Sequence, residues 1–234
     1  MNTLNQTKYK CNICKDKGYL LNDKHQFIGY CECHKKKQAL KYLKSSNLEH
    51  VYKKYTFENW KTPTNWHKEY KQQVIKFAKQ PSNAFLYLAQ SGNGKTHLLS
   101  ALTVYLIGQG KSGLYVKWQE EIAHAKRNFW TMSAELVERM KTVEVLYLDD
   151  FLKGENLNDI HKEETRLAFE IIDARYINPN LITIVSSEWN IVDLGRYNEA
   201  LIGRLVEMAG GIGSSNIIDS GYKQDGNWRL RKED

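Results

Sequence analysis

Proline is scarce in this sequence, with three residues in 234, and no apolar run approaches the roughly 20 residues that a membrane-spanning helix needs. The first ten residues are polar and lack the apolar core of a signal peptide. We therefore expect a globular cytoplasmic protein with no membrane partner. Hydrophobic residues make up 41% of the chain, which is enough to form the core of one large or two small domains.

Arginine is absent from residues 1–80, which carry 17 lysines against six acidic residues and a formal charge of +11. Residues 81–234 carry 17 basic and 21 acidic residues, a formal charge of −4. The uneven distribution indicates two different parts of the chain. A lysine-rich face suits an acidic protein or a nucleic-acid backbone, and it is equally compatible with a simple solvated surface.

Cysteine is absent after residue 33, and all four cysteines form two close pairs, Cys11-x-x-Cys14 and Cys31-x-Cys33, with 16 residues between them. Thiols stay reduced in the cytosol, so short spacings of this kind predict a zinc site. Because the second pair is C-x-C, His34 or His25 could replace one cysteine as a ligand. Four small buried thiols without a metal are the remaining alternative.

From residue 84 onward, short apolar runs alternate with amphipathic segments, which predicts an α/β fold with a five-stranded parallel sheet. We place domain boundaries at 1–50 for a small zinc-binding domain, 51–80 for a linker and connecting helix, and 81–234 for the α/β domain. Expected strands are 84–88, 114–116, 143–148, 181–186 and 217–219. Expected helices are 35–46, 66–79, 95–109, 120–129, 133–141, 163–176 and 198–208.

Residues 89–96, Ala-Gln-Ser-Gly-Asn-Gly-Lys-Thr, fit the Walker A pattern G-x-x-x-x-G-K-[ST] except at its first position. The loop follows an apolar strand and opens a helix, so its N–H groups and the helix N-terminus would bind the phosphates of ATP. Lys95 would reach the β and γ phosphates, and the Thr96 hydroxyl would bind Mg²⁺. The expected nucleotide-binding residues are Ser91, Gly92, Asn93, Gly94, Lys95, Thr96, His97 and Asp149.

Three further features could complete an ATPase site. An apolar strand ends in Asp149 and Asp150, the first suited to holding Mg²⁺ and the second to acting as general base; the alternative is two acids capping a turn. The next strand ends at Ser186 and Ser187, where a hydroxyl could lie beside the γ-phosphate and the attacking water, although strand-end serines are often turn residues. Arg204 could project into a neighbouring subunit's site, or be a surface arginine.

The order of these motifs resembles that of AAA+ helicase loaders of the DnaC/DnaI type, including phage-encoded versions, and of the related IstB-type transposition ATPases. The likeness includes the cysteine pairs, residues 55–59, Ser91–Leu98, Leu148–Asp150, Ile171–Tyr176 and Gly203–Leu205. It implies a P-loop AAA+ core without a C-terminal lid, Walker B roles for Asp149 and Asp150, and sensor 1 and arginine-finger roles for Ser187 and Arg204. The family usually has Asn where Ser187 stands, which suggests altered sensing of the nucleotide, and Asp150 is shorter than the Glu of most AAA+ ATPases, which suggests slow hydrolysis.

The resemblance implies an ATP-dependent loader of a replicative, DnaB-type hexameric helicase onto single-stranded DNA. The zinc module would dock on the helicase, and copies of the chain would assemble through the ATP site. Alternatives are an IstB-like transposition helper ATPase and a non-catalytic ATP-binding helicase adaptor. Candidates for contact with DNA lie in residues 118–130 and include Lys126, Arg127 and Phe129, whereas Trp118 and Trp130 suit core packing.

Overall fold

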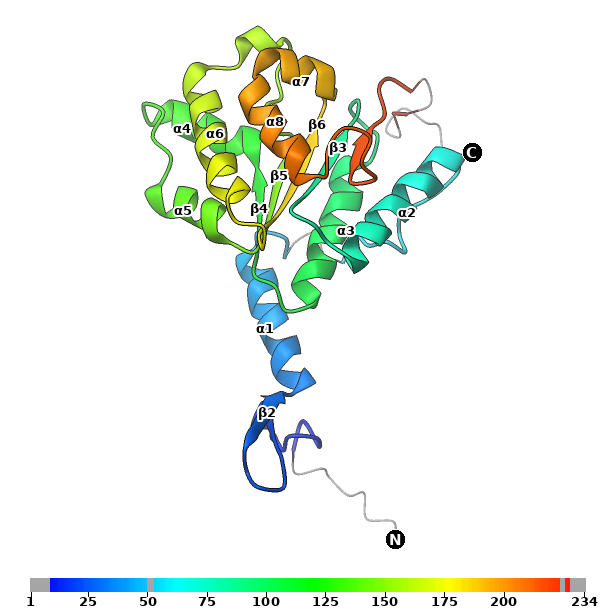
Figure 1. Ribbon diagram of the computed structural model, residues 1–234, viewed down its shortest axis with the longest axis vertical. Helices are drawn as coiled ribbons and strands as arrows, with labels where there is room; N and C mark the ends of the chain where they lie inside the picture. Colours follow the sequence, from blue (N-terminus) through cyan, green and yellow to red (C-terminus); the bar gives the residue numbers. More distant parts are fainter. Residues whose placement is uncertain (1–8, 50–52, 224–225, 228–234) are drawn as a thin grey trace.

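The computed structural model describes residues 9–49, 53–223 and 226–227. The molecule is elongated, with a small N-terminal hairpin joined by helix α1 (Glu32–Ser45) to a larger body built around a sheet (Figure 1). Within the described residues, no helix combines the length and the apolar character needed to cross a bilayer. The division at residues 50 and 80 stays a prediction.

The larger body contains a five-stranded sheet with the order β4-β5-β6-β3-β7, and every pairing in it is parallel. The predicted α/β fold with a five-stranded parallel sheet is therefore confirmed. Leu88 at the end of β3 pairs with Ser187 at the end of β6, so the loops after these strands meet at one edge of the sheet. The strands are β3 (Ala84–Leu88), β4 (Gly113–Lys117), β5 (Val145–Asp149), β6 (Ile182–Ser187) and β7 (Ile217–Asp219).

Helices cover both faces of the sheet, which explains why the strands read as continuous apolar runs. Phe85 and Tyr87 of β3 belong to a core with helices α1 to α3, whereas Leu86 and Leu88 belong to a second core with α4 to α8. The remaining helices are α2 (Asn65–Lys79), α3 (Lys95–Gly108), α4 (Trp118–Arg127), α5 (Ala134–Thr142), α6 (Lys162–Tyr176), α7 (Ile191–Tyr197) and α8 (Glu199–Met208), with a 3-10 turn, η1 (Leu157–Asp159).

Most of the expected strands and helices differ by one or two residues in their bounds, and the two strands of the N-terminal hairpin were not expected. Two further differences have a clear physical reason. Helix α1 begins at Glu32, three residues earlier than predicted, because Cys31 is extended and serves as its N-cap. Helix α7 was not predicted; Asn190 caps it by accepting a hydrogen bond from the backbone N–H of Asp193 at 2.8 Å. A helix of only seven residues carries too little periodicity to be found from sequence.

The hairpin pairs β1 (Tyr19–Leu21) with β2 (Phe27–Tyr30) in antiparallel fashion. At the other end of α1, the carbonyl of Ser46 accepts a hydrogen bond from the backbone N–H of Tyr115 at 2.8 Å. The fully buried Leu48 follows in the core shared with α3. The base of α1 is thus joined to strand β4 of the sheet.

Candidate functional site

The loop between β3 and α3 has the backbone form that a phosphate-binding loop requires. Gly92 and Gly94 have φ of 74° and 82°, in the region that favours glycine. A Cβ on Gly94 would lie 2.3 Å from the ring of Trp60, so glycine is also required there by close approach of the connector. The loop then opens α3 at Lys95, which directs the helix N-terminus toward the loop.

The Lys95 side chain is buried inside this loop. Its ammonium donates to the carbonyls of Ala89 at 2.6 Å and Gln90 at 2.9 Å. Burial lowers the pKa of Lys95 to about 8, and the carboxylates of Glu188, Asp150 and Asp149 oppose that shift. A bound phosphate would supply an anionic partner in place of two neutral carbonyls.

Asn93 provides a test of fit for a ligand. Its side chain lines the cavity at this loop and is 2% exposed, and its oxygen accepts a hydrogen bond from Tyr87. Its amide nitrogen is one of the buried donors that have no partner in the described part of the chain. Buried donors are normally satisfied, so this nitrogen fits a site that receives a hydrogen-bond acceptor such as a phosphate oxygen.

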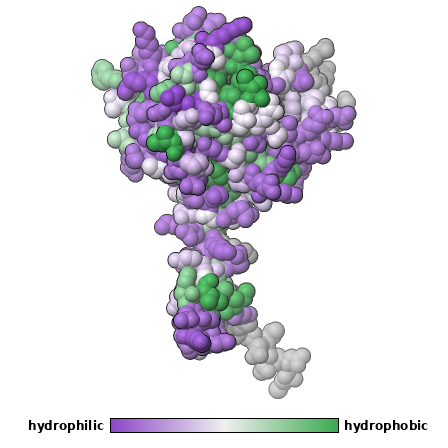
Figure 2. All heavy atoms as spheres, viewed as in Figure 1, coloured by the Kyte–Doolittle hydropathy of each residue, from purple (hydrophilic) through white to green (hydrophobic). Residues whose placement is uncertain are grey.

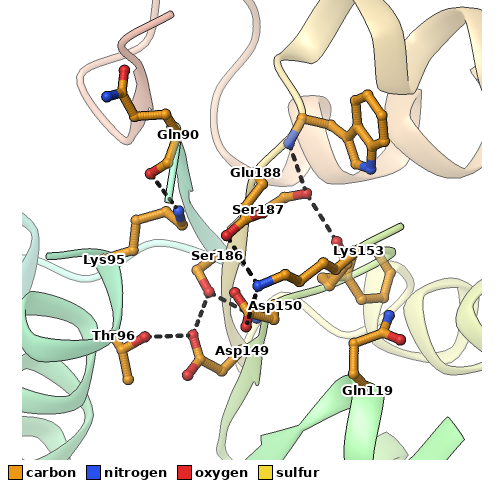
Figure 3. Close-up of polar contacts among 12 residues, drawn as sticks. Gln90, Lys95, Thr96, Gln119, Asp149, Asp150, Lys153, Ser186, Ser187 and Glu188 are labelled. Carbon is orange, nitrogen blue, oxygen red and sulfur yellow. Dashed lines mark hydrogen bonds and ion pairs between the residues drawn. The ribbon is translucent and has the colours of Figure 1, made fainter. Parts of the chain in front are cut away.

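Asp149 lies at the end of β5 and faces Thr96 of α3 (Figure 3). Its Oδ1 accepts from the Thr96 hydroxyl at 3.2 Å and from Ser186 at 2.5 Å, and further hydrogen bonds come from Tyr147 at 2.7 Å and Tyr115 at 2.9 Å. The structure therefore brings together the two residues predicted to hold magnesium. Carboxylate and hydroxyl oxygens are suitable ligands for that ion.

Asp150 follows at a turn with φ of 53° and points its carboxylate toward the cavity. Lys153 lies between two carboxylates, with Nζ 3.2 Å from Asp150 Oδ2 and 3.0 Å from Glu188 Oε1 (Figure 3). Sequence reasoning missed Lys153 and Glu188. The available signal was their position in the loops after two strands that end beside the nucleotide loop: Glu188 directly follows β6, and Lys153 lies four residues after the end of β5.

Ser187 and Arg204 lie outside this group. The Ser187 hydroxyl donates to the carbonyl of Phe151 at 2.8 Å, so the side chains at the end of β6 that reach the site are Ser186 and Glu188. Arg204 lies on α8, where Nε donates to Asp173 at 2.8 Å and the guanidinium stacks over Phe169 at 4.6 Å. Its assignment as an arginine finger stays a prediction about a second copy of the chain.

A cavity of about 280 Å³ adjoins the loop, and its other wall comes from the connector and α2. The His97 Nε2 atom is 2.9 Å from the Thr56 carbonyl, and its ring packs near Tyr55 and Trp60. Connector and α2 residues that line the cavity are Tyr55, Asn59, Trp60, Lys61 and His67.

The C-terminal segment crosses the same loop. The Gln90 side chain binds Lys223 with both amide atoms, donating to its carbonyl at 2.9 Å and accepting from its N–H at 2.5 Å. Asn227 lies so close to Gly92 that a Cβ there would be 2.0 Å from its Oδ1. From the family resemblance we also expect Trp228 and Arg229 to substitute in part for the sensor 2 arginine of a C-terminal lid, but these two residues fall outside the described part of the chain.

The four cysteines form a second candidate site, at the hairpin. All four Sγ atoms lie within 4.8 Å of one another, with Cys11 and Cys31 at 3.8 Å and Cys14 and Cys33 at 3.3 Å. Tetrahedral zinc with Zn–S bonds of about 2.3 Å spaces its sulfurs about 3.8 Å apart, so the cluster fits this ion. His34 instead stacks on Tyr30 at 4.7 Å.

The pKa values of two of the four thiols are shifted in opposite directions. Backbone N–H groups of Cys14 and Ile13 lower the pKa of Cys11 to about 6. A hydrogen bond with Cys14 and burial raise the pKa of Cys33 to about 12. Four adjacent thiols therefore cannot all ionise unless a positive ion lies between them.

The sequence matches the family described as IstB-like ATP binding protein over residues 32–209. It is 30% identical to phage-like element PBSX protein XkdC of Bacillus subtilis over 86% of this chain and 80% of that protein. It is 27% identical to the replicative helicase loader DnaC of Buchnera aphidicola, covering 46% of this chain and 47% of that protein.

The fold is similar to the crystal structure of the DnaC helicase loader, with a TM-score of 0.58 and 20% identity over 67% of this chain and 94% of that one. This likeness supports the fold, a parallel sheet with helices on both faces. With its family match across residues 32–209, the chain belongs to the IstB-like ATP-binding proteins.

Proposed function

We propose that the chain is an ATPase that loads a replicative hexameric helicase onto single-stranded DNA. The observation that supports it most is the meeting of the nucleotide loop, the Thr96–Asp149 pair and Asp150 at one cavity. Similarity to a replicative helicase loader suggests that ATP binding and hydrolysis serve helicase loading.

In the proposed reaction, the loop N–H groups and Lys95 bind the phosphates, and Thr96 and Asp149 would hold Mg²⁺, which supplies positive charge to the phosphoryl oxygens. Asp150 accepts a proton from water as the water oxygen bonds to the terminal phosphorus. The bond to the bridging oxygen breaks, and ADP leaves with the electron pair. Tyr115 and Tyr147 keep Asp149 in place through their hydrogen bonds.

The hairpin that carries the cysteine cluster is the proposed helicase-docking surface. Its large apolar side chains are exposed, with Phe27, Ile28 and Tyr30 at 58, 61 and 59%. Figure 2 shows hydrophobic atoms gathered at this end of the molecule. An exposed apolar surface on so small a module is typical of a protein-binding site.

For single-stranded DNA, the proposed contact is the end of α4 and the following turn. Phe129 is 95% exposed, and both Phe129 and Trp130 have positive φ, at 50° and 60°. Lys126 lies 5.3 Å from the centre of the Trp130 ring. An exposed aromatic beside basic side chains suits base stacking. Trp118, by contrast, is buried and donates to Glu164 at 2.8 Å.

Complex mass and helicase activity test the proposal. The full chain is mixed with candidate hexameric helicases with and without ATP, and release of an annealed oligonucleotide is measured on single-stranded circles coated with single-strand-binding protein. We expect ATP-dependent loading, with docking reduced in a Phe27→Ser/Ile28→Ser variant and intact in Lys95→Ala. If the chain forms a complex with none of the helicases tested, the proposal is refuted.

The family match supports a second candidate, an IstB-like transposition helper. Such a protein would assemble on double-stranded DNA with ATP and would form no complex with the helicase. A non-catalytic adaptor would bind the helicase and ATP without releasing phosphate. The complex-mass experiment, repeated with duplex DNA and with phosphate release recorded, separates the three.

A further inference from the structure

Lys153 is a cation of the nucleotide cavity that none of the expected motifs includes. It comes from the loop after β5 and extends toward the end of β6 (Figure 3). Its ammonium contacts Asp150 at 3.2 Å and Glu188 at 3.0 Å, and all three residues line the cavity that contains Lys95. The side chain is 37% exposed, so it can be reached by a ligand.

The turn that presents Lys153 is held firmly in an unfavourable backbone form. Asp150 and Leu152 have φ of 53° and 52°, in the left-handed region that is strained for a residue other than glycine. Phe151 and Leu152 are fully buried, and the N–H of Phe151 donates to the Ser186 carbonyl at 2.8 Å. The buried Phe151 and Leu152 therefore hold the backbone of this turn in place and fix the position from which the Lys153 side chain extends.

The carboxylates of Asp150 and Glu188 favour a cation between them when a triphosphate occupies the cavity. A triphosphate brings several negative charges next to Asp150 and Glu188, which would repel it. Partial burial lowers the pKa of Lys153, but its contacts with Glu188 and Asp150 outweigh this effect and raise it overall. The ammonium therefore stays charged and is available to a third anion.

We propose that Lys153 is a second phosphate-binding cation. When ATP binds, the Lys153 ammonium breaks its contact with Asp150 and binds an oxygen of the terminal phosphate. Asp150 is then free to accept the proton of the attacking water. The inference rests on the proposed ATPase function and adds a residue of the same chain to it. Lys153 would thereby distinguish ATP, which has this phosphate, from ADP, which lacks it.

The test is the ratio of ATP to ADP affinity, measured by displacement of a fluorescent nucleotide from wild type, Lys153→Gln and Lys153→Arg. A lost charge-assisted hydrogen bond predicts about tenfold weaker ATP binding in Lys153→Gln with little change for ADP. Lys153→Arg should retain the ratio. Both nucleotides are measured on one preparation, so an unfolded fraction does not alter the ratio.

A double variant distinguishes phosphate binding from simple neutralisation of Glu188. If Lys153 contacts the phosphate, Lys153→Gln/Glu188→Gln should stay selectively weak for ATP; full recovery of the wild-type ratio would overturn the inference, as would an unchanged ratio in Lys153→Gln. Failure of the wild-type protein to bind ATP would instead refute the nucleotide site itself. Wild-type binding without hydrolysis would refute only the ATPase function.

Discussion

Replacing two arginines of neighbouring helices separates a structural role from a functional one. Arg175 is predicted to stabilise the fold, and Arg204 is predicted to act in ATP hydrolysis. Arg175 of α6 is fully buried. Its guanidinium donates to Thr183 Oγ1 and to the carbonyls of Met140, Val143 and Ile182, at 2.8 to 2.9 Å. It thus joins α6 to the end of α5 and to β6.

Replacing Arg175 with methionine keeps most of the volume and removes every one of these donors. Each buried acceptor that loses its partner costs about 1–3 kcal/mol. Burial lowers the pKa of Arg175 to about 9, because the buried guanidinium loses its hydration. Methionine has no charge to bury, so the variant avoids this desolvation cost, which offsets part of the loss. The net expectation is a loss of about 3–5 kcal/mol in the free energy of unfolding.

Arg204→Met is the matched control. Arg204 is 30% exposed and pairs with Asp173, so its loss should cost about 1 kcal/mol or less. Urea denaturation followed by circular dichroism measures both variants, with equal m-values required. If the free energy of unfolding of Arg175→Met is within about 1 kcal/mol of that of Arg204→Met, the assigned role of the buried network is wrong.

Arg204→Met also tests the arginine-finger prediction. This variant should keep its ATP affinity and lose DNA-stimulated hydrolysis. Weak ATP binding by the monomer would contradict the prediction.

Three more variants or treatments test the sites. Lys95→Ala should abolish binding of a fluorescent ATP analogue with an unchanged circular dichroism spectrum, and retained binding would contradict the loop assignment. Asp149→Asn should reduce Mg²⁺-dependent phosphate release by about 100-fold while ATP still binds, since it removes a metal ligand. Chelation should release one zinc ion per chain, detected with a metallochromic dye, and reduce helicase docking without loss of ATP binding; a chain purified without zinc would refute the metal site.

The sheet and the nucleotide loop could be predicted from sequence because their signals are local. The strand before the loop, the two loop glycines and the helix after it lie within a short segment, and each residue type has one main physical reason to be there. The cysteine cluster is similarly local. Helix α1 runs between this cluster and the sheet, and the extended Cys31 at its start explains the error in that boundary.

The orientation of the β6 strand end could not be read in the same way. Ser186 shares a face with Ile184, which packs beside α3, whereas Ser187 shares the opposite face with Val185. Both faces of this strand are buried, so its apolar run does not say which serine reaches Asp149. Arg175 was equally hidden, because two of its carbonyl acceptors, Met140 and Val143, are 35 and 32 residues away in the sequence.

Tyr115 shows how the nucleotide site and the cysteine module are physically connected. Its hydroxyl donates to Asp149 Oδ2 at 2.9 Å, and its backbone N–H donates to the Ser46 carbonyl at the base of α1 at 2.8 Å. Burial and the nearby Asp149 carboxylate raise the pKa of Tyr115, so its hydroxyl remains a donor. A ligand that moves Asp149 therefore acts on a residue bonded to the helix that carries the proposed docking surface. If the hairpin docks on a partner as proposed, this contiguity would connect nucleotide binding to that surface through one strand of the sheet.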